Sequence, residues 1–445
     1  MIATASHQRQ SSCPLPSTAA PRSSAAMPSA AAVPSAGAPL TTSRGAALYI
    51  GALLGPGLLL LPGLAAAAAG PASILAWVAL LALSGVFAMV FAALGRRYPS
   101  AGGVIGYVAA GLGPRAGLVA GWSFLSGVVA GAPVVCLIGA SYVTGLTGGG
   151  RPARAAIAAL LLLVVLALAA RGLRTSATAQ VLLVALLIGV VAVAVAGSAH
   201  AARAANWTPF APHGWLAVGH AAATLMLSFV GWEAAAPLTT RFADPSRQLA
   251  RVVAIALAVT TTLYLGLAVV TIGVLGPGAA TTVPLAALLN RAVGPAGTAV
   301  AAVAAVVLTL GAVNAYINGA AAMAGQLSSS RAGLDGAGRP APRLLAAIAA
   351  SGLLLITLYG LGVVSPASLV AIPTALFLAV YLGSMLAAAR VLDGPARLVS
   401  IPAAAAVVVM MCFCGWALAA VAAVAVAVTG RRFRVTRKCQ TPGVS

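Results

Sequence analysis

Long apolar runs separated by short polar loops dominate the pattern of hydrophobic and polar positions. A bilayer core needs about 20 apolar residues per crossing helix, so these runs predict membrane-spanning helices. Strand-like alternation is absent from the sequence, which argues against an outer-membrane barrel. Twelve spans are predicted, at about 45–70, 73–94, 114–145, 152–170, 176–197, 215–240, 252–275, 297–327, 344–363, 366–389, 398–413 and 415–430. The last two are short and could form a hairpin or one long helix.

Composition supports the same class. The chain is 61% hydrophobic and 7% charged, whereas soluble domains carry about 25% charged residues. We therefore expect an all-α integral membrane protein whose membrane-embedded domain covers residues 44–430. Residues 1–43 are rich in Ala, Ser, Pro and Thr and predict a disordered cytoplasmic tail. Residues 431–445 form a basic cytoplasmic tail.

The net charge of +21 reflects arginines placed between the apolar runs. This is the distribution that the positive-inside rule produces, and it argues against a nucleic-acid partner. With twelve spans and a cytoplasmic N-terminus, 21 of the 25 basic residues face the cytoplasm. The other four are Arg151, Arg154, Arg203 and Arg291. We expect a multi-pass protein of the cytoplasmic (inner) membrane with both termini cytoplasmic.

The first span contains a predicted helix break. Its sequence LLGPGLLLLPG, residues 53–63, places Pro56 between Gly55 and Gly57. Proline removes a backbone donor and clashes with the preceding turn, and glycine permits an unwound conformation. An unwound segment exposes backbone N–H groups and a half-helix N-terminus, which attract an anion such as a carboxylate.

The sixth span contains a second predicted break, from Gly231 to Pro237, and an acid. Glu233 is one of only four acidic residues and lies inside an apolar run. A charged side chain at the membrane centre costs about 3 kcal/mol on insertion scales, so it suggests a functional site. The alternative is a protonated Glu233 that only hydrogen-bonds a neighbouring helix. Breaks in spans one and six occupy matching positions in two five-helix halves, which is typical of inverted-repeat transporters.

Four stretches give the chain a resemblance to the amino acid–polyamine–organocation (APC) superfamily of permeases. Within it, the chain is most similar to the bacterial amino-acid efflux branch that exports methionine and branched-chain amino acids. The resemblance implies a LeuT-like fold with a five-plus-five inverted repeat, broken helices one and six, and two peripheral helices. The stretches are GPGLLLLPG (55–63), RRYPSAGGVIGY (96–107), FVGWEAAAPLTTRFADPSRQLAR (229–251) and NAYINGAAAMAGQLSSSRAGL (314–334).

The resemblance also implies a substrate site and a coupling residue. The first break would bind the substrate carboxylate, the second would meet its ammonium group, and Glu233 would couple transport to protons. Pro56 departs from the family pattern, because relatives usually have Ser, Thr or Ala there. The substrate-binding positions so implied are Gly55, Pro56, Gly57, Phe229, Val230, Gly231 and Asn314.

The leading functional hypothesis is a secondary transporter that exports neutral or apolar amino acids in exchange for protons. The sequence contains no G-x-x-x-x-G-K-[ST] motif, so a gradient rather than ATP is expected to supply energy. We expect no cofactor and no metal, with sodium left open as the driving ion. An importer or exchanger of the same fold is an alternative, and a sensor or a membrane-embedded enzyme is a weaker one. The expected partners are the amino-acid substrate and the bilayer, with the protein a monomer or homodimer.

Overall fold

The structure, a computed structural model, describes residues 41–98, 103–173, 177–235, 242, 245–327 and 339–438. These residues form helices joined by turns. The α-helices are α1 (Thr42–Leu53), α2 (Leu61–Ala69), α3 (Ser73–Arg97), α4 (Gly103–Leu112), α5 (Pro114–Thr147), α6 (Arg151–Ala170), α7 (Ala177–Ser198), α8 (Leu216–Leu225), α9 (Trp232–Ala235), α10 (Pro245–Leu275), α11 (Pro284–Val293), α12 (Pro295–Leu327), α13 (Pro342–Gly360), α14 (Pro366–Val391), α15 (Gly394–Cys412) and α16 (Leu418–Lys438).

The expected spans fall on these helices. Among the described residues, nine helices are long and apolar enough to cross a membrane. Spans one and six are the interrupted groups α1–α2 and α8–α9, as their Gly and Pro residues predicted. The last two spans are separate helices, because a turn around Gly415 divides α15 from α16. The fold is therefore that of an all-α, multi-pass membrane protein.

Two short helices, α4 and α11, were not predicted from the apolar pattern. Each has ten residues, which is too short to cross a bilayer. α4 follows the loop after α3, and its first described residue, Gly103, has a φ of 48°. α11 carries a one-sided apolar face, with Leu285, Leu288 and Leu289 buried. Such a face packs along the bundle instead of crossing the membrane.

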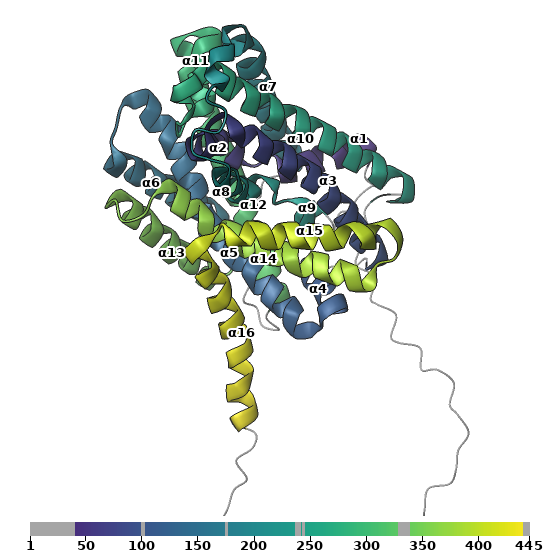
Figure 1. The fold of residues 1–445 in the computed structure, drawn as a ribbon. Helices are drawn as coiled ribbons and strands as arrows, with labels where there is room; N and C mark the ends of the chain where they lie inside the picture. The colour runs from purple at the N-terminus through teal and green to yellow at the C-terminus, as the bar shows by residue number, and fades with distance from the viewer. Residues whose placement is uncertain are drawn as a thin grey trace, which may run out of the picture. The chain divides into compact units, whose positions relative to one another are not determined.

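The long helix α5 lies at the centre of the packing. It contacts α12 and α14 along its length, and Figure 1 shows α5 and α14 side by side. Small residues allow the close approach. A Cβ placed on Gly139 of α5 would lie 2.6 Å from Oγ1 of Thr309 on α12. Close packing through small residues is the usual way in which helices associate in lipid.

Large apolar side chains also point away from the bundle. Leu182, Leu354 and Leu398 are 65%, 60% and 70% exposed. In water such a surface would be a liability, but in a bilayer it faces lipid tails. The outward-facing leucines therefore agree with the hydropathy of the sequence.

One loop acid, Asp393, forms an ion pair. Arg97 Nη1 lies 3.2 Å from Asp393 Oδ2, with both side chains mostly exposed. Exposed pairs of this kind contribute about 0–1 kcal/mol, so this contact orients loops more than it stabilises the fold. Asp244 and Asp335 lie outside the described residues, as do residues 1–40 of the predicted tail. The basic segment from 431 continues helix α16 as far as Lys438.

Candidate functional site

The first break lies where the sequence predicts it. α1 ends at Leu53, Gly55 is extended with φ −84° and ψ 169°, and a 3₁₀ turn η1 (Pro56–Leu59) leads into α2. Pro56 has no N–H to donate. The N–H of Gly57 has no hydrogen-bond partner among the described residues. The break therefore offers at least one free backbone donor.

The second break begins earlier than the sequence prediction of Gly231 to Pro237. α8 ends at Leu225 and tightens into a 3₁₀ turn η5 (Met226–Phe229) before Val230 becomes extended. Gly231 has a φ of 153°, a conformation that L side chains rarely adopt. α9 then starts at Trp232, and Pro237 lies outside the described residues. The described unwound segment is thus Met226–Gly231, with Glu233 just after it.

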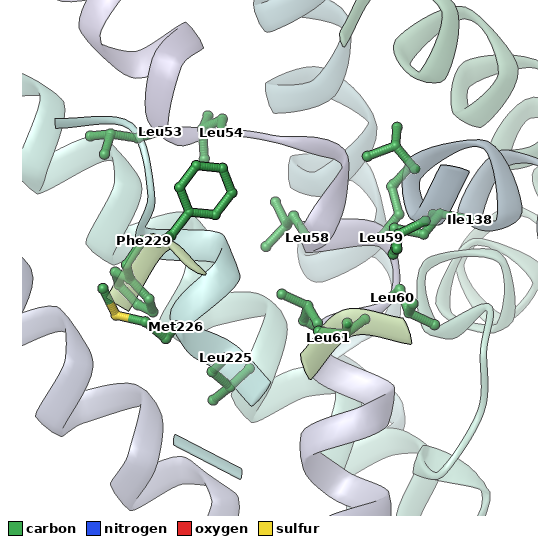
Figure 2. Close-up of a cluster of buried hydrophobic side chains, with 14 of the residues drawn as sticks. Leu53, Leu54, Leu58, Leu59, Leu60, Leu61, Ile138, Leu225, Met226 and Phe229 are labelled. Carbon is green, nitrogen blue, oxygen red and sulfur yellow. The ribbon is translucent and has the colours of Figure 1, made fainter. Parts of the chain in front are cut away.

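The two breaks are in direct contact. A Cβ on Gly231 would overlap the backbone carbonyl of Ala52, and a Cβ on Gly57 would lie 3.2 Å from Ser228 Oγ. Figure 2 shows Leu54 and Leu58 of the first break beside Phe229 of the second, whereas Leu59 and Leu60 lie on the side of Ile138. The absence of side chains at these glycines therefore lets the two unwound backbones meet. This is the juxtaposition that an inverted repeat with a shared site predicts.

Three buried tyrosines supply hydrogen bonds to carbonyls at the breaks. Tyr142 on α5 donates to the Leu59 carbonyl at 2.7 Å. The Tyr264 hydroxyl on α10 lies 2.8 Å from the carbonyls of both Leu53 and Ser228. In a bilayer, an unpaired carbonyl cannot find water, so these hydroxyls stabilise the unwound segments. Tyr264 in addition ties the two breaks to each other.

The third tyrosine, Tyr381 on α14, connects the second break to the acid. Its hydroxyl lies 2.6 Å from Glu233 Oε2 and 3.1 Å from the Phe229 carbonyl. The N–H of Gly231 donates to the same carboxyl oxygen at 3.0 Å. Glu233 is only 3% exposed and is the one acidic side chain that is buried in the part of the chain that the structure describes. The predicted coupling residue therefore accepts two hydrogen bonds at one carboxyl oxygen.

Aromatic rings surround the polar groups of the second break. Phe229 is fully buried and packs with Tyr264, with ring centroids 5.4 Å apart, and with Trp77, at 6.0 Å. Phe87 and Phe91 place their edges against the Tyr381 ring at 4.7 and 5.3 Å. These contacts exclude water and fix the tyrosine hydroxyls in place.

The eighth span approaches the first break through Tyr316, and the predicted role of Asn314 stays a prediction. The Tyr316 hydroxyl of α12 lies 3.7 Å from the Cβ position of Gly55. The predicted residue, Asn314, is buried two positions earlier, and its carbonyl accepts from Asn318 Nδ2 at 2.8 Å. Tyr316 is thus the better-placed side chain of α12 for a ligand at the break.

The sequence analysis missed Tyr142, Tyr264, Tyr316, Tyr381 and Ser228. A buried tyrosine in an apolar span needs a partner for its hydroxyl, and that need is the signal that could have selected them. In the described part of the chain, no group of three or more His, Cys, Asp or Glu side chains lies close enough to hold a metal ion.

Two touching helix breaks, with a buried carboxyl beside them, are typical of transporters with an inverted repeat. The chain belongs to the amino acid permease family, whose sequence profile matches residues 40–333.

The chain is also similar in sequence to individual amino acid transporters. An uncharacterised amino acid permease of Bacillus subtilis, YecA, is 32% identical over 359 residues, which are 79% of this chain and 85% of the relative. YjeH of Escherichia coli, an L-methionine/branched-chain amino acid exporter, is 46% identical over 78 residues, 18% of this chain and 19% of the relative. The glutamate/serine transporter AimA of B. subtilis is 32% identical over 80 residues, 18% of this chain and 15% of the relative.

Proposed function

We propose that this permease exports neutral, apolar amino acids of the methionine, leucine, isoleucine and valine class across the cytoplasmic membrane, in exchange for protons. The observation that carries the proposal is the buried Glu233 carboxyl, held by Tyr381 and Gly231 at the edge of the second break.

The charge of the site supports a neutral substrate. A zwitterionic amino acid brings one carboxylate and one ammonium group, which the donors and carbonyls of two broken helices can match. A cationic side chain would need a second buried acid, and Glu233 is the one buried acid of the described residues. The leucine-rich and aromatic surroundings of the breaks suit an apolar side chain. The similarity to YjeH, an L-methionine/branched-chain amino acid exporter, supports the same substrate class and the outward direction.

The hydrogen bonds suggest how a proton would act on the break. The Tyr381 hydroxyl carries one proton, so it serves either the carboxylate of Glu233 or the carbonyl of Phe229. With Glu233 ionised, the hydroxyl donates to the carboxylate. With Glu233 protonated, the carboxyl can donate to the tyrosine oxygen, and the hydroxyl proton turns to Phe229. Protonation would thus change a hydrogen bond within the second break itself.

Counterflow in proteoliposomes, with and without a pH gradient, tests this function. Vesicles loaded with unlabelled leucine should accumulate labelled leucine and methionine, and an acid-outside gradient should drive efflux of preloaded leucine. Accumulation of glutamate or serine instead would favour the substrates in the name of AimA. Uptake with the proton gradient, in place of efflux, would make the protein an importer. Binding without flux would indicate a sensor.

A further inference from the structure

Ser228 is a buried hydroxyl without a hydrogen bond. Its side chain is 3% exposed, and Oγ has no partner among the described residues. Several other buried serines in these helices make a local bond instead. Ser141 and Ser384 each donate to the carbonyl four residues earlier, at 2.8 Å. That local bond is the ordinary way in which a serine is accommodated inside a membrane helix.

The unpartnered hydroxyl lies between the two breaks. Ser228 belongs to η5, and its Oγ is 3.2 Å from the Cβ position of Gly57 in η1. Its own carbonyl is already bonded by Tyr264, which fixes the backbone of Ser228 against the first break. Gly57 contributes the N–H that has no partner among the described residues, next to Pro56, which has none to give. The unpartnered hydroxyl therefore lies next to Gly57, the residue that carries the unpartnered N–H.

We propose that Ser228 is a substrate-binding residue whose hydroxyl donates to the carboxylate of the transported amino acid, together with the Gly57 N–H. The proposal rests on the function proposed above. Two adjacent donors suit an anion and not an ammonium group, because a backbone N–H cannot accept. The hydroxyl also adds a donor beside the position where Pro56 removes one. A serine hydroxyl reaches a new partner by one rotation about χ1.

A purely structural role predicts that Ser228→Ala lowers the stability of the protein without ligand, whereas the lack of a partner among the described residues predicts no such loss. Removing a buried hydroxyl that has no partner should leave the protein as stable as before, or make it more stable. A substrate-binding hydroxyl leaves the empty protein unaffected, but its loss weakens the complex with substrate. Thermal unfolding, measured without and with leucine, therefore separates the two roles.

The matched variants are Ser228→Ala and Ser123→Ala. Ser123 on α5 is also fully buried and lacks a partner for Oγ within the described residues, so the control removes the same group away from the breaks. Competition against labelled leucine in counterflow uses L-leucine and L-leucinamide, which lacks the carboxylate. Ser228→Ala should lower the apparent affinity for leucine about tenfold, the effect of a hydrogen bond to a charged group. Its affinity for leucinamide and its melting temperature without ligand should stay at the wild-type values.

Three results would overturn the proposal. One is a Ser228→Ala variant that binds leucine as tightly as Ser123→Ala does, while the wild type transports leucine. Another is an equal loss of affinity for leucine and leucinamide. If Ser228→Ala fails to fold, Ser228→Cys takes its place, because cysteine has a similar volume and a weaker donor. The third contrary result is an unchanged affinity of the Ser228→Cys variant for leucine. Failure of wild-type counterflow for every amino acid would instead remove the proposed function itself.

Discussion

Tyr381 on α14 lies 2.6 Å from the carboxyl of Glu233, a residue 148 positions earlier in the chain. The contact links the packed core of the bundle to the unwound part of the sixth span. It is also the shortest of the hydrogen bonds made by the tyrosine hydroxyls at the two breaks. A proton added at Oε2 of Glu233 would therefore rearrange the hydrogen bonds of Tyr381.

Tyr381→Phe should shift the pH dependence of transport. The variant removes the donor that stabilises the ionised Glu233, while the ring can keep its packing against Phe87 and Phe91. The carboxyl should then hold its proton more strongly, so the pH midpoint of gradient-driven flux should move upward. Flux measured between pH 5 and 9 gives the midpoint. Tyr142→Phe, which removes a hydroxyl at the other break, is the control and should leave the midpoint unchanged.

Tyr264→Phe should destabilise the protein. Its hydroxyl lies 2.8 Å from the carbonyls of Leu53 and Ser228. The Leu53 carbonyl also accepts from the Gly55 N–H at 2.9 Å, whereas the Ser228 carbonyl has no second donor among the described residues. Leaving a buried carbonyl unpaired costs about 1–3 kcal/mol, so the melting temperature in detergent should fall by several degrees. Tyr107→Phe removes a buried tyrosine hydroxyl that caps neither break and provides the comparison. Equal melting temperatures of the two variants would show that the hydrogen bonds of the Tyr264 hydroxyl do not contribute to the stability of the protein.

The two breaks could be predicted from sequence because their causes are local. Gly55, Pro56 and Gly57 cannot sustain a regular helix, whatever packs around them. The start of the second break was placed too late, because η5 begins at Met226 without any glycine or proline to mark it. There the contact of Gly231 with the backbone of Ala52, a tertiary effect, decides the geometry.

The carbonyl partners of the tyrosine hydroxyls could not be predicted from sequence patterns. Tyr142 bonds a carbonyl 83 residues away, and Tyr264 bonds carbonyls 36 and 211 residues away. No periodicity within one helix encodes such pairs. Asn314 was selected by resemblance, whereas Tyr316, two residues later, has its hydroxyl beside Gly55. On an α-helix two positions correspond to about 200°, so adjacent polar residues face different directions.

Gly57→Val should abolish transport without preventing folding. A Cβ at this position already lies 3.2 Å from both Leu61 Cδ1 and Ser228 Oγ, and the methyl groups of valine would fill the space beside the first break. We expect at least a tenfold loss of initial counterflow rate. Gly189→Val on α7, where a Cβ meets nothing within 4 Å, should transport normally. Wild-type affinity in the Gly57→Val protein would mean that the break is a kink with no part in binding.

Cysteine labelling should establish the proposed orientation. The arginine distribution predicts that the loop around Arg203 faces outward and the segment around Arg343 faces the cytoplasm. In a background without native cysteines, Ala204→Cys should react with an impermeant maleimide in intact cells. Arg343→Cys should react only after lysis. Both positions are exposed in the structure, so accessibility within the protein does not limit the reaction. The reverse pattern would invert the topology.

Glu233→Gln gives the decisive test of proton coupling. Glutamine keeps the length and the hydrogen-bonding capacity of the side chain, so Tyr381 and the Gly231 N–H can still find a partner. It cannot gain or lose a proton. If transport is coupled through this group, the variant should exchange leucine in counterflow, a process that needs no net proton movement. It should at the same time lose the response of efflux to an imposed pH gradient.

A purely structural role of Glu233 predicts a different result. Glutamine would then replace the carboxyl group, and both counterflow and the response to the pH gradient would be kept. A folded Glu233→Gln protein that keeps the wild-type response to the pH gradient would therefore assign Glu233 to structure, and repeating the gradient experiment with sodium would then identify the driving ion.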